Sequence, residues 1–509
     1  MAPNKTYYIT TAIDYANGSP HLGHAVEKIG ADVMARYRRR KGDDVHFLIG
    51  MDEHGQKVLQ SAQAAGVSPQ EWVDGIAGQF LDAWEVLNIS HDDFIRTTEE
   101  RHREGVHEII RRIREKGDLY LGTYAGYYCV GCEGYKTRDE LTGEDATDPR
   151  CPVHPSLEIQ WMEEENWFFR LSNYAEPLLK LLDERPEFIL PDIRRNEIRK
   201  VIEGGLEDIS VSRARLPWGI PWPDDPGHIV YVWLDALTNY LTAIGFPAES
   251  YRDHWPADVH VIGKDITRFH CIYWPAFLMS AGVELPRTVW AHGFVTYGGR
   301  KLSKSAGVTF ELPEAMERHG PEALRYYLLR EVPWNGDGDI TRERFDERYT
   351  TELANDIGNL ASRTLAMIQK YRGGVIPPGD PRSLDRKAAE AVAEYEAAMD
   401  AGLLHLGIAS ALALASHANG FVEEQAPWAL AKDPDGGPEL EATLASLARA
   451  LLVLATLLHP IMPAKMEDMA RRLGVGEVPT LSESLILNLA QRAVERGAPL
   501  FPRADLLGG

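Results

Sequence analysis

The feature that most constrains the fold is an alternation of strand-like and helix-like runs that stops and later resumes. From Thr6 to about residue 115, strand-like runs such as TYYITTAI and DVHFLIG alternate with helix-like runs such as AVEKIGADVMARYRRR. This alternation is typical of a parallel α/β sheet. It fails between about 118 and 224, and HIVYVWLDA and DVHVIGKDI then restore it. We therefore predict one Rossmann-like parallel-sheet domain with halves at 1–117 and 225–300, split by an insert at 118–224.

The last third of the chain has a different pattern. Leu353, Ile357, Leu360 and Ile368 recur at the spacing of one helix face, and PPGDP, DPDGGP and HPIMP interrupt the helical runs. This predicts an α-helical bundle at 349–509, with residues 301–348 between it and the sheet.

Composition excludes several classes of protein. With 44% hydrophobic and 26% charged residues in 509, the chain is neither disordered nor fibrous, and about three domains are expected. The start lacks an apolar signal region, and the run ALLVLATLL is too short to cross a bilayer. We expect a cytoplasmic protein with no membrane partner. The net charge of −22 argues against indiscriminate nucleic-acid binding, although a local basic patch can hold one RNA.

Two histidines follow the first strand-like run. The strand ends near Ile13, NGSP forms the turn, and Pro20 suits the first helical position, which places His21 and His24 on one side of the first helical turn. Gly23 between them lets a ligand approach the backbone. A helix N-terminus after the first strand favours phosphate, so these residues predict a polyphosphate site. The alternative is that one histidine caps the helix and the other lies on the surface.

A lysine-rich segment, TYGGRKLSKSAG, carries Lys301 and Lys304, which suit phosphate as compact charges. HLGH and KLSKS together resemble the His-Ile-Gly-His and Lys-Met-Ser-Lys-Ser signatures of the class I aminoacyl-tRNA synthetases. The resemblance implies that His21, His24, Lys301 and Lys304 are catalytic, binding ATP with Mg²⁺ and stabilising charge on the α-phosphate and pyrophosphate.

Further motifs resemble one family of this class, the methionyl-tRNA synthetases, over essentially the whole chain. They are AIDYANGSPHLGHA, GMDEHGQ, YVWLDALTNY, IGKDITRFHCIYWPA and NLASR. The resemblance implies a methionine pocket formed by Ala12, Ile13, Tyr15, Asp52, Trp233, Ala236, Leu237, Tyr240, Phe269 and His270. Asp52 ends a strand-like run and suits the substrate ammonium, while the aromatic residues suit a thioether. Ile13 replaces a leucine of the family pattern and Leu237 a proline, which affects the shape of the pocket. Taken singly, each aromatic residue is better explained as part of the core.

The resemblance also implies that residues 301–348 form the KLSKS loop and a region that contacts the tRNA stem. It implies the remaining ligand contacts as well. ATP is expected at His21, Gly23, His24, Gly263, Asp265, His292 and Lys304. In the helical part, Asn359, Arg363 and Trp428 match the residues with which the family reads the CAU anticodon, by hydrogen bonds and stacking. The alternative for Trp428 is a buried core residue after Pro427.

The insert carries a metal-binding pattern. Cys129, Cys132, Cys151 and His154 form a C-x₂-C-x₁₈-C-x₂-H array, which favours one tetrahedral, structural Zn²⁺. Incidental buried thiols are the alternative. Cys271 stands apart and is expected to be a small apolar core residue.

These observations predict an enzyme that activates L-methionine with ATP and transfers it to tRNA(Met). Two alternatives stay open: a nucleotidylyltransferase that shares the nucleotide fold, and a non-catalytic RNA-binding relative. The helical part and the metal array argue against the first, and the presence of His21, His24 and Lys304 argues against the second. The chain ends without an appended tRNA-binding or dimerisation module, so we expect a monomer.

Overall fold

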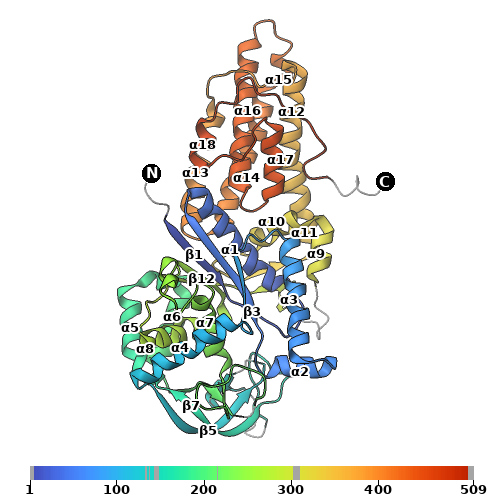
Figure 1. Cartoon of the computed structure of the whole chain (residues 1–509). Helices are drawn as coiled ribbons and strands as arrows, with labels where there is room; N and C mark the ends of the chain where they lie inside the picture. Colours follow the sequence, from blue (N-terminus) through green and yellow to red (C-terminus); the bar gives the residue numbers. More distant parts are fainter. Residues whose placement is uncertain are drawn as a thin grey trace. The chain divides into compact units, whose positions relative to one another are not determined.

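Parallel strands and covering helices form one of two units in the computed structural model (Figure 1). The structure describes residues 5–131, 134–136, 138–142, 148–214, 216–301 and 310–502. The α/β unit spans Lys5–Pro20 and Asp44–His292, and the helical unit includes His21–Asp43 and Gly293–Gly509.

The main sheet of the α/β unit is parallel throughout, in the order β2-β3-β1-β12-β13-β8, with β4 also paired to β3. Its strands are β1 (Thr6–Thr11), β2 (Asp14–Tyr15), β3 (Asp44–Asp52), β4 (Asp93–Arg96), β8 (Ile189–Leu190), β12 (Val259–Gly263) and β13 (Val289–His292). In the centre of the sheet Ile9 lies opposite Val259, so strands from before and after the insert pair directly. The predicted split sheet is confirmed.

The α/β unit also contains helices, whose apolar faces need a partner. They are α2 (Gln56–Ala65), α3 (Pro69–Val86), α4 (Glu100–Lys116), α5 (Ala175–Glu184), α6 (Asp192–Glu203), α7 (Val232–Thr242) and α8 (Trp274–Ala281). α4 packs against both α7 and α8, and Ile109, Leu241 and Phe277 lie in their shared core. The sequence DITRFHCIYW also forms a π-helical turn, Phe269–Tyr273, that leads into α8.

The insert forms an antiparallel sheet in the order β6-β5-β7-β9. Its strands are β5 (Leu119–Cys129), β6 (Gly134–Lys136), β7 (Gln160–Phe169) and β9 (Ile209–Ser210), and β10 (Ser212–Arg213) pairs with β11 (Ile229–Val230) nearby. Two elements differ from expectation. The run HIVYVWLDA, predicted as a strand of the parallel sheet, forms only the short strand β11, which pairs antiparallel with β10, and the rest of the run begins helix α7. In addition, β8 lies inside the predicted insert range, yet it pairs with β13 at the edge of the parallel sheet. Two residues are too few to produce a periodic signal.

The helical unit contains α1 (Leu22–Lys41), α9 (Leu312–His319), α10 (Pro321–Glu331), α11 (Arg342–Arg348), a π-helical stretch (Tyr349–Gly358), α12 (Asn359–Arg372), α13 (Ser383–Asp400), α14 (Leu404–Gln425), α15 (Pro427–Leu430), α16 (Gly437–Leu458), α17 (Pro463–Arg472) and α18 (Leu481–Ile486). The predicted apolar face is confirmed, since Leu353, Ile357, Leu360 and Ile368 are all buried.

Among the described residues, only α16 is long and apolar enough to cross a membrane, and 89% of its most apolar window is buried. That burial is the property of a core helix, and α16 packs against α12, α13, α14, α17 and α18.

Helix α1 is held to the other helices of its unit by close contacts far apart in sequence. A Cβ atom on Gly30 would lie 1.9 Å from the ring of Trp334, so only glycine allows this approach. The buried Arg325 of α10 contacts the Asp32 carboxylate at 2.7 Å and donates to the Ile461 carbonyl at 2.7 Å. The buried ion pair is therefore also hydrogen-bonded, as such pairs require.

Candidate active site

Four neighbouring parallel strands end at the same edge of the α/β unit's sheet, and predicted site residues stand at or just after each end. Ala12 and Ile13 follow β1, Asp52 ends β3, Gly263 ends β12 and His292 ends β13. Gly263 lies opposite His292 in the pairing of β12 with β13. Ligands of open parallel sheets bind beyond these carboxyl ends, so the fold brings the predicted residues to the expected edge.

A buried pair, Tyr240 and His270, has a fixed hydrogen-bond direction. The Nδ1 atom of His270 lies 3.0 Å from the Ile266 carbonyl, which can only accept, so Nδ1 carries the proton. Nε2 therefore accepts from the Tyr240 hydroxyl at 2.7 Å. The Tyr240 carbonyl in turn accepts from the Tyr8 hydroxyl at 2.8 Å. Contacts at both ring nitrogens thus hold the imidazole in one orientation.

Two aromatic rings lie beside this pair. Trp233 stacks on Phe269 with centroids 3.6 Å apart and planes 4° apart, and Trp233 meets His270 edge-on at 6.3 Å. Ala236 and Leu237, from the same helix α7 as Trp233, are buried. The π-helical turn places Phe269 and His270 beside each other, and such turns are frequent at functional sites. These contacts group Trp233, Tyr240, Phe269 and His270 as the resemblance implies.

The end of β3 is tied to its neighbours. The segment Asp14–Tyr15 pairs with Met51–Asp52, and the Ala16 N–H donates to the Asp52 carbonyl at 2.9 Å. Ile13 packs over β3, because a Cβ atom on Gly50 would lie 2.9 Å from its side chain. Tyr15, Asp52 and Ile13 are therefore neighbours.

Gly263 also makes room for an acidic side chain. A Cβ atom on Gly263 would lie 2.7 Å from the carboxylate of Asp265, which occupies a short 3-10 turn at Lys264–Ile266. Glycine at this position therefore lets the Asp265 carboxylate fold back over the strand end.

In the helical unit, His21 and His24 cap the start of α1 reciprocally. The Nδ1 atom of His21 accepts from the N–H groups of Gly23 and His24 at 3.1 and 3.3 Å, and the Nδ1 atom of His24 accepts from the His21 N–H at 3.3 Å. The two rings stack with centroids 3.7 Å apart. Burial lowers the pKa of His24 well below its usual value, and the neighbouring His21 and Lys28 lower it further. The ring of His24 is therefore neutral at pH 7.

This cap corrects one detail of the sequence analysis. Pro20 does not occupy the first helical position, because His21 is the N-cap and the helix begins at Leu22. His21 does cap the helix, as the alternative interpretation holds. His24 is only partly exposed rather than a freely exposed surface residue.

The lysine-rich segment follows a small sheet in the helical unit. Strands β14 (Val295–Tyr297) and β16 (Gly338–Ile340) pair in parallel, and β15 (Arg300–Lys301) pairs with β14 through a turn at Gly298 and Gly299, both of positive φ. The Asp339 carboxylate accepts from the Gly299 N–H and the Thr296 hydroxyl, both at 2.7 Å. Lys304 lies outside the described residues.

Three of the four predicted metal ligands lie together in the insert. The ligand atoms of Cys129, Cys151 and His154 are all within 4.8 Å of one another, with 3.8 Å between the Cys129 sulfur and His154 Nδ1. Both cysteines are buried. The fourth, Cys132, lies outside the described residues. Cys271 is separate and buried, and burial raises the pKa of its thiol, as expected of a core residue.

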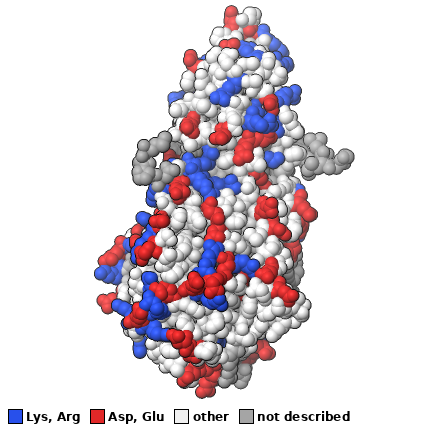
Figure 2. All heavy atoms as spheres, viewed as in Figure 1, with Lys and Arg blue, Asp and Glu red and all other residues white. Residues whose placement is uncertain are grey.

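Of the predicted RNA-reading residues in the helical unit, Asn359 and Trp428 are exposed and Arg363 is partly exposed. Asn359 and Arg363 lie one turn apart on α12, and Arg363 contacts Glu423 of α14 at 2.7 Å. Trp428, in α15, is 39% exposed, so the core alternative does not fit it. On the face shown in Figure 2, basic side chains gather in small groups among acidic ones despite the net charge of −22.

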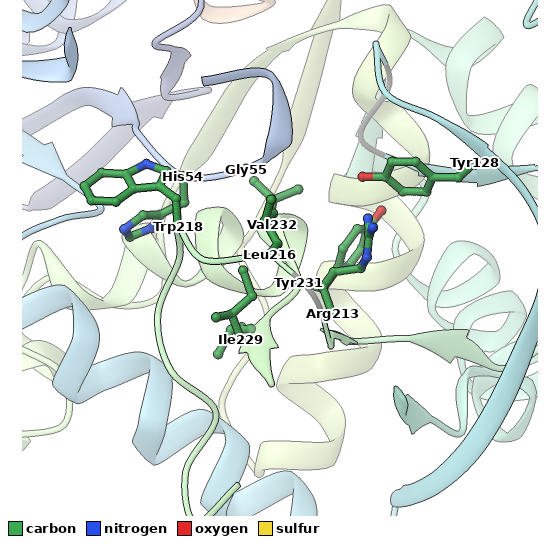
Figure 3. Close-up of a pocket in the computed structure, with 10 residues that line it drawn as sticks. His54, Gly55, Tyr128, Arg213, Leu216, Trp218, Ile229, Tyr231 and Val232 are labelled. Atoms are coloured by element: carbon green, nitrogen blue, oxygen red, sulfur yellow. The ribbon is translucent and has the colours of Figure 1, made fainter. Parts of the chain in front are cut away.

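A small pocket in the α/β unit was not anticipated from the sequence (Figure 3). Its lining comes from the segment after β3, from the insert and from the start of α7, and it includes His54, Gly55, Tyr128, Arg213, Leu216, Trp218, Ile229, Val230, Tyr231 and Val232. The Nδ1 atom of His54 also lies 2.7 Å from the carboxylate of Asp235. Neither residue was predicted from the sequence to have a role. The motif GMDEHGQ was the available signal, since His54 follows Asp52 there with only Glu53 between them.

Known proteins resemble this chain along nearly its whole length. The family model described as tRNA synthetases class I (M) matches residues 7–144 and 135–365. The methionine–tRNA ligase of Caldanaerobacter subterraneus is 43% identical over 99% of this chain and 79% of that enzyme. The Streptomyces coelicolor enzyme of the same name is 42% identical over 98% and 97%. The crystal structure of Mycobacterium tuberculosis methionyl-tRNA synthetase bound by methionyl-adenylate matches 98% of this chain and 100% of that chain, with a TM-score of 0.94 and 40% identity.

Proposed function

This chain belongs to the methionyl-tRNA synthetases of class I, and we propose that it joins L-methionine to the 3′-terminal adenosine of tRNA(Met) with ATP. The reaction has two steps, formation of methionyl-adenylate with release of pyrophosphate and then acyl transfer to the tRNA. The observation that carries the proposal is the likeness, over nearly the full chain, to an enzyme solved with methionyl-adenylate.

The proposed methionine pocket combines one charge with buried aromatic surface. Asp52 binds the substrate ammonium, because a carboxylate at the end of β3 forms a strong charge-assisted hydrogen bond. The fixed Tyr240 and His270 pair and the Trp233 and Phe269 stack surround the thioether, whose polarizable sulfur favours aromatic edges. The proposed set is Ala12, Ile13, Tyr15, Asp52, Trp233, Ala236, Leu237, Tyr240, Phe269 and His270.

For ATP we propose His21, Gly23, His24, Gly263, Asp265, His292 and Lys304. The methionine carboxylate attacks the α-phosphorus and pyrophosphate leaves, so no covalent bond to the enzyme is needed. His21, His24, Lys301 and Lys304 are the proposed catalytic residues, which stabilise the charge that develops on the phosphates. Mg²⁺ enters with ATP and neutralises phosphate charge.

The anticodon is the proposed ligand of the exposed residues on α12 and α15. A half-exposed Trp428 has a face on which an unstacked base can lie, and Asn359 and Arg363 can hydrogen-bond base edges. Arg363 also contacts Glu423, in a partly exposed ion pair on the surface of the bundle.

The cysteine and histidine cluster fits a structural zinc ion. Two thiolates and an imidazole whose ligand atoms lie within 4.8 Å of one another are compatible with one tetrahedral ion. We propose that Cys129, Cys132, Cys151 and His154 bind one Zn²⁺ per chain. A fully protein-ligated zinc leaves no open position, so its contribution is to the fold of the insert.

The function is tested by exchange of labelled pyrophosphate into ATP with each of the twenty amino acids. Methionine is expected to support the fastest exchange, and a CAU-anticodon tRNA to be charged with methionine. Faster exchange with another amino acid contradicts the substrate. Absence of exchange with all twenty supports the non-catalytic RNA-binding alternative.

The metal is tested on protein purified without chelator. Elemental analysis is expected to find one zinc per chain, and Cys129→Ser is expected to lower the melting temperature because metal binding contributes to folding. Cys271→Ser is the matched control, since that buried thiol lies outside the cluster. Zinc-free protein of full stability contradicts the site.

We also propose that the enzyme acts in the cytoplasm as a monomer. Charging of tRNA serves translation, which supports the location. Light scattering coupled to size exclusion measures the oligomeric state, and a mass of twice 56.9 kDa contradicts the monomer.

A further inference from the structure

A carboxylate at the centre of the α/β unit lies between two imidazoles. Asp235 of α7 is completely buried. One of its oxygens lies 2.7 Å from His54 Nδ1 and the other lies 2.8 Å from His102 Nε2. His102, which belongs to α4, is also completely buried, and its Nδ1 atom lies 2.8 Å from the Thr242 hydroxyl. The network joins α4, α7 and the segment after β3.

The chemistry of the groups fixes the direction of these bonds. Burial alone would raise the pKa of Asp235, but the charge and hydrogen bonds of His54 and His102 hold it below its usual value. The group is therefore an ionised carboxylate, which can only accept, so each imidazole donates to it. Both rings are thereby fixed in orientation, His54 through Nδ1 and His102 through Nε2.

Close helix packing makes the network possible. A Cβ atom on Gly105 of α4 would lie 2.2 Å from the Thr242 side chain, so glycine lets α4 approach α7. His102 is almost one turn before Gly105 on α4 and faces α7 there. Its position therefore depends on backbone packing rather than on the ligand.

The network ends at the segment that carries Asp52. His54 follows Asp52 closely, and its ring lies edge-on to Trp218 at 5.4 Å in the pocket of Figure 3. Glu53 lies between Asp52 and His54 in the sequence. Its carboxylate contacts Arg96 at 2.6 Å and Thr98 at 2.5 Å, and its carbonyl accepts from Trp218 at 2.6 Å. Hydrogen bonds therefore hold this segment on both sides.

The carboxylate of the network belongs to helix α7, which supplies four of the ten proposed pocket residues. Asp235 stands between Trp233 and Ala236 on α7. One carboxylate thus connects the segment of the proposed ammonium ligand to the helix of the proposed thioether ligands. A pocket that binds both ends of one small substrate needs these two segments at a fixed separation.

We propose that His54, Asp235 and His102 are positioning residues, which hold the segment of Asp52 against α7 at the separation that methionine requires. The proposal rests on the proposed function of this pocket. His102 is on α4 and is not one of the proposed methionine ligands, so its effect on methionine binding passes through Asp235.

The test compares His102→Leu with His102→Gln in the full chain. Glutamine can place its amide nitrogen near the position of Nε2 and donate to Asp235, whereas leucine cannot. Methionine and ATP affinities are measured by equilibrium dialysis. We expect His102→Leu to weaken methionine binding about tenfold and to change ATP binding by less than about twofold, and His102→Gln to restore methionine binding to within about threefold.

Ser280→Ala is the matched control, because it also removes a buried hydrogen bond in this unit, 2.7 Å long, to Asp118. It is expected to cost stability and to leave both affinities unchanged. Equal losses of methionine and ATP binding in His102→Leu overturn the proposal, as does a His102→Gln protein as defective as His102→Leu.

A second pair covers the case in which His102→Leu does not fold. In His54→Asn the amide nitrogen replaces Nδ1, whereas in His54→Gln it lies one carbon too far away. Tighter methionine binding by His54→Asn than by His54→Gln is expected, and the reverse order overturns the proposal. Exchange by the unmodified enzyme is measured first, so failure of the methionine assignment is distinguishable from failure of the network.

Discussion

His270 and Trp428 are both proposed to touch a substrate, but the protein holds them in opposite ways. His270 is 2% exposed, and both of its ring nitrogens are hydrogen-bonded to the protein. Trp428 is 39% exposed in a helix of four residues that begins at Pro427. The first residue is part of the core, whereas the second stands at its surface.

This difference has an energetic consequence. Removing a buried, hydrogen-bonded side chain disturbs both ligand binding and the free energy of unfolding, because its neighbours lose packing and partners. Removing a side chain from the surface changes mainly the contact with the ligand. The two regions are therefore expected to respond differently to similar truncations.

The largest effect is expected for His270→Ala. The change removes a buried ring and leaves the Tyr240 hydroxyl without its acceptor, at a cost of about 1–3 kcal/mol for the hydroxyl alone. We expect methionine affinity to fall about 100-fold and the melting temperature to fall with it. Dialysis and calorimetry on one preparation measure both. Unchanged methionine affinity would remove His270 from the pocket.

Trp428→Ala is expected to separate the two activities. A base stacked on an aromatic ring contributes about 1–3 kcal/mol, so charging of CAU-anticodon tRNA falls by that amount while methionine-dependent exchange stays at the unmodified level. A buried tryptophan would instead cost about 3–5 kcal/mol of stability. Joint loss of melting temperature, exchange and charging contradicts the anticodon role.

Tyr240→Phe is a milder change in the buried region. It removes only the donor to His270 Nε2, and one buried hydrogen bond contributes about 1 kcal/mol, so methionine affinity is expected to fall about fivefold. ATP affinity serves as the internal control and stays constant. A larger loss than that of His270→Ala would show that the hydroxyl itself contacts the substrate.

The smallest effect is expected for Glu423→Ala on the exposed surface. Its ion pair with Arg363 is partly exposed and contributes less than about 1 kcal/mol to stability. Without Glu423, Arg363 has one acceptor fewer on the protein, so charging is expected to be unchanged or slightly faster. A marked loss of charging would mean that Glu423 orients Arg363 for the anticodon.

The split sheet was predictable because long strands and helices repeat their apolar pattern. The composition of TYYITTAI and DVHVIGKDI alone predicts β1 and β12. The motifs that contain Tyr240 and His270 predict, by resemblance, that these two residues share one pocket. The π-helical turn at Phe269–Tyr273 was not predictable, since it differs from an α-helix only by hydrogen-bond register. The two-residue strand β8 carries no periodicity at all.

The long-range polar contacts could not be predicted from the sequence either. Asp235 lies in HIVYVWLDA, a run whose composition is strand-like although it leads into helix α7, and its partners His54 and His102 are 181 and 133 residues away. Nothing in the local sequence distinguishes it from a carboxylate that faces solvent. The exposure of Trp428 also depends on how α15 meets its neighbours, which composition does not encode.

The contact between Asp32 and Arg325 can form only long after α1 has been synthesised. The two residues are 293 positions apart, and translation adds about 5–20 residues per second, so α1 leaves the ribosome about 15–60 s before its buried partner exists. During that interval Asp32 remains solvated and the face of α1 around Gly30 has no Trp334 to cover it. The helix that carries HLGH is therefore made well before the residues that bury its inner face.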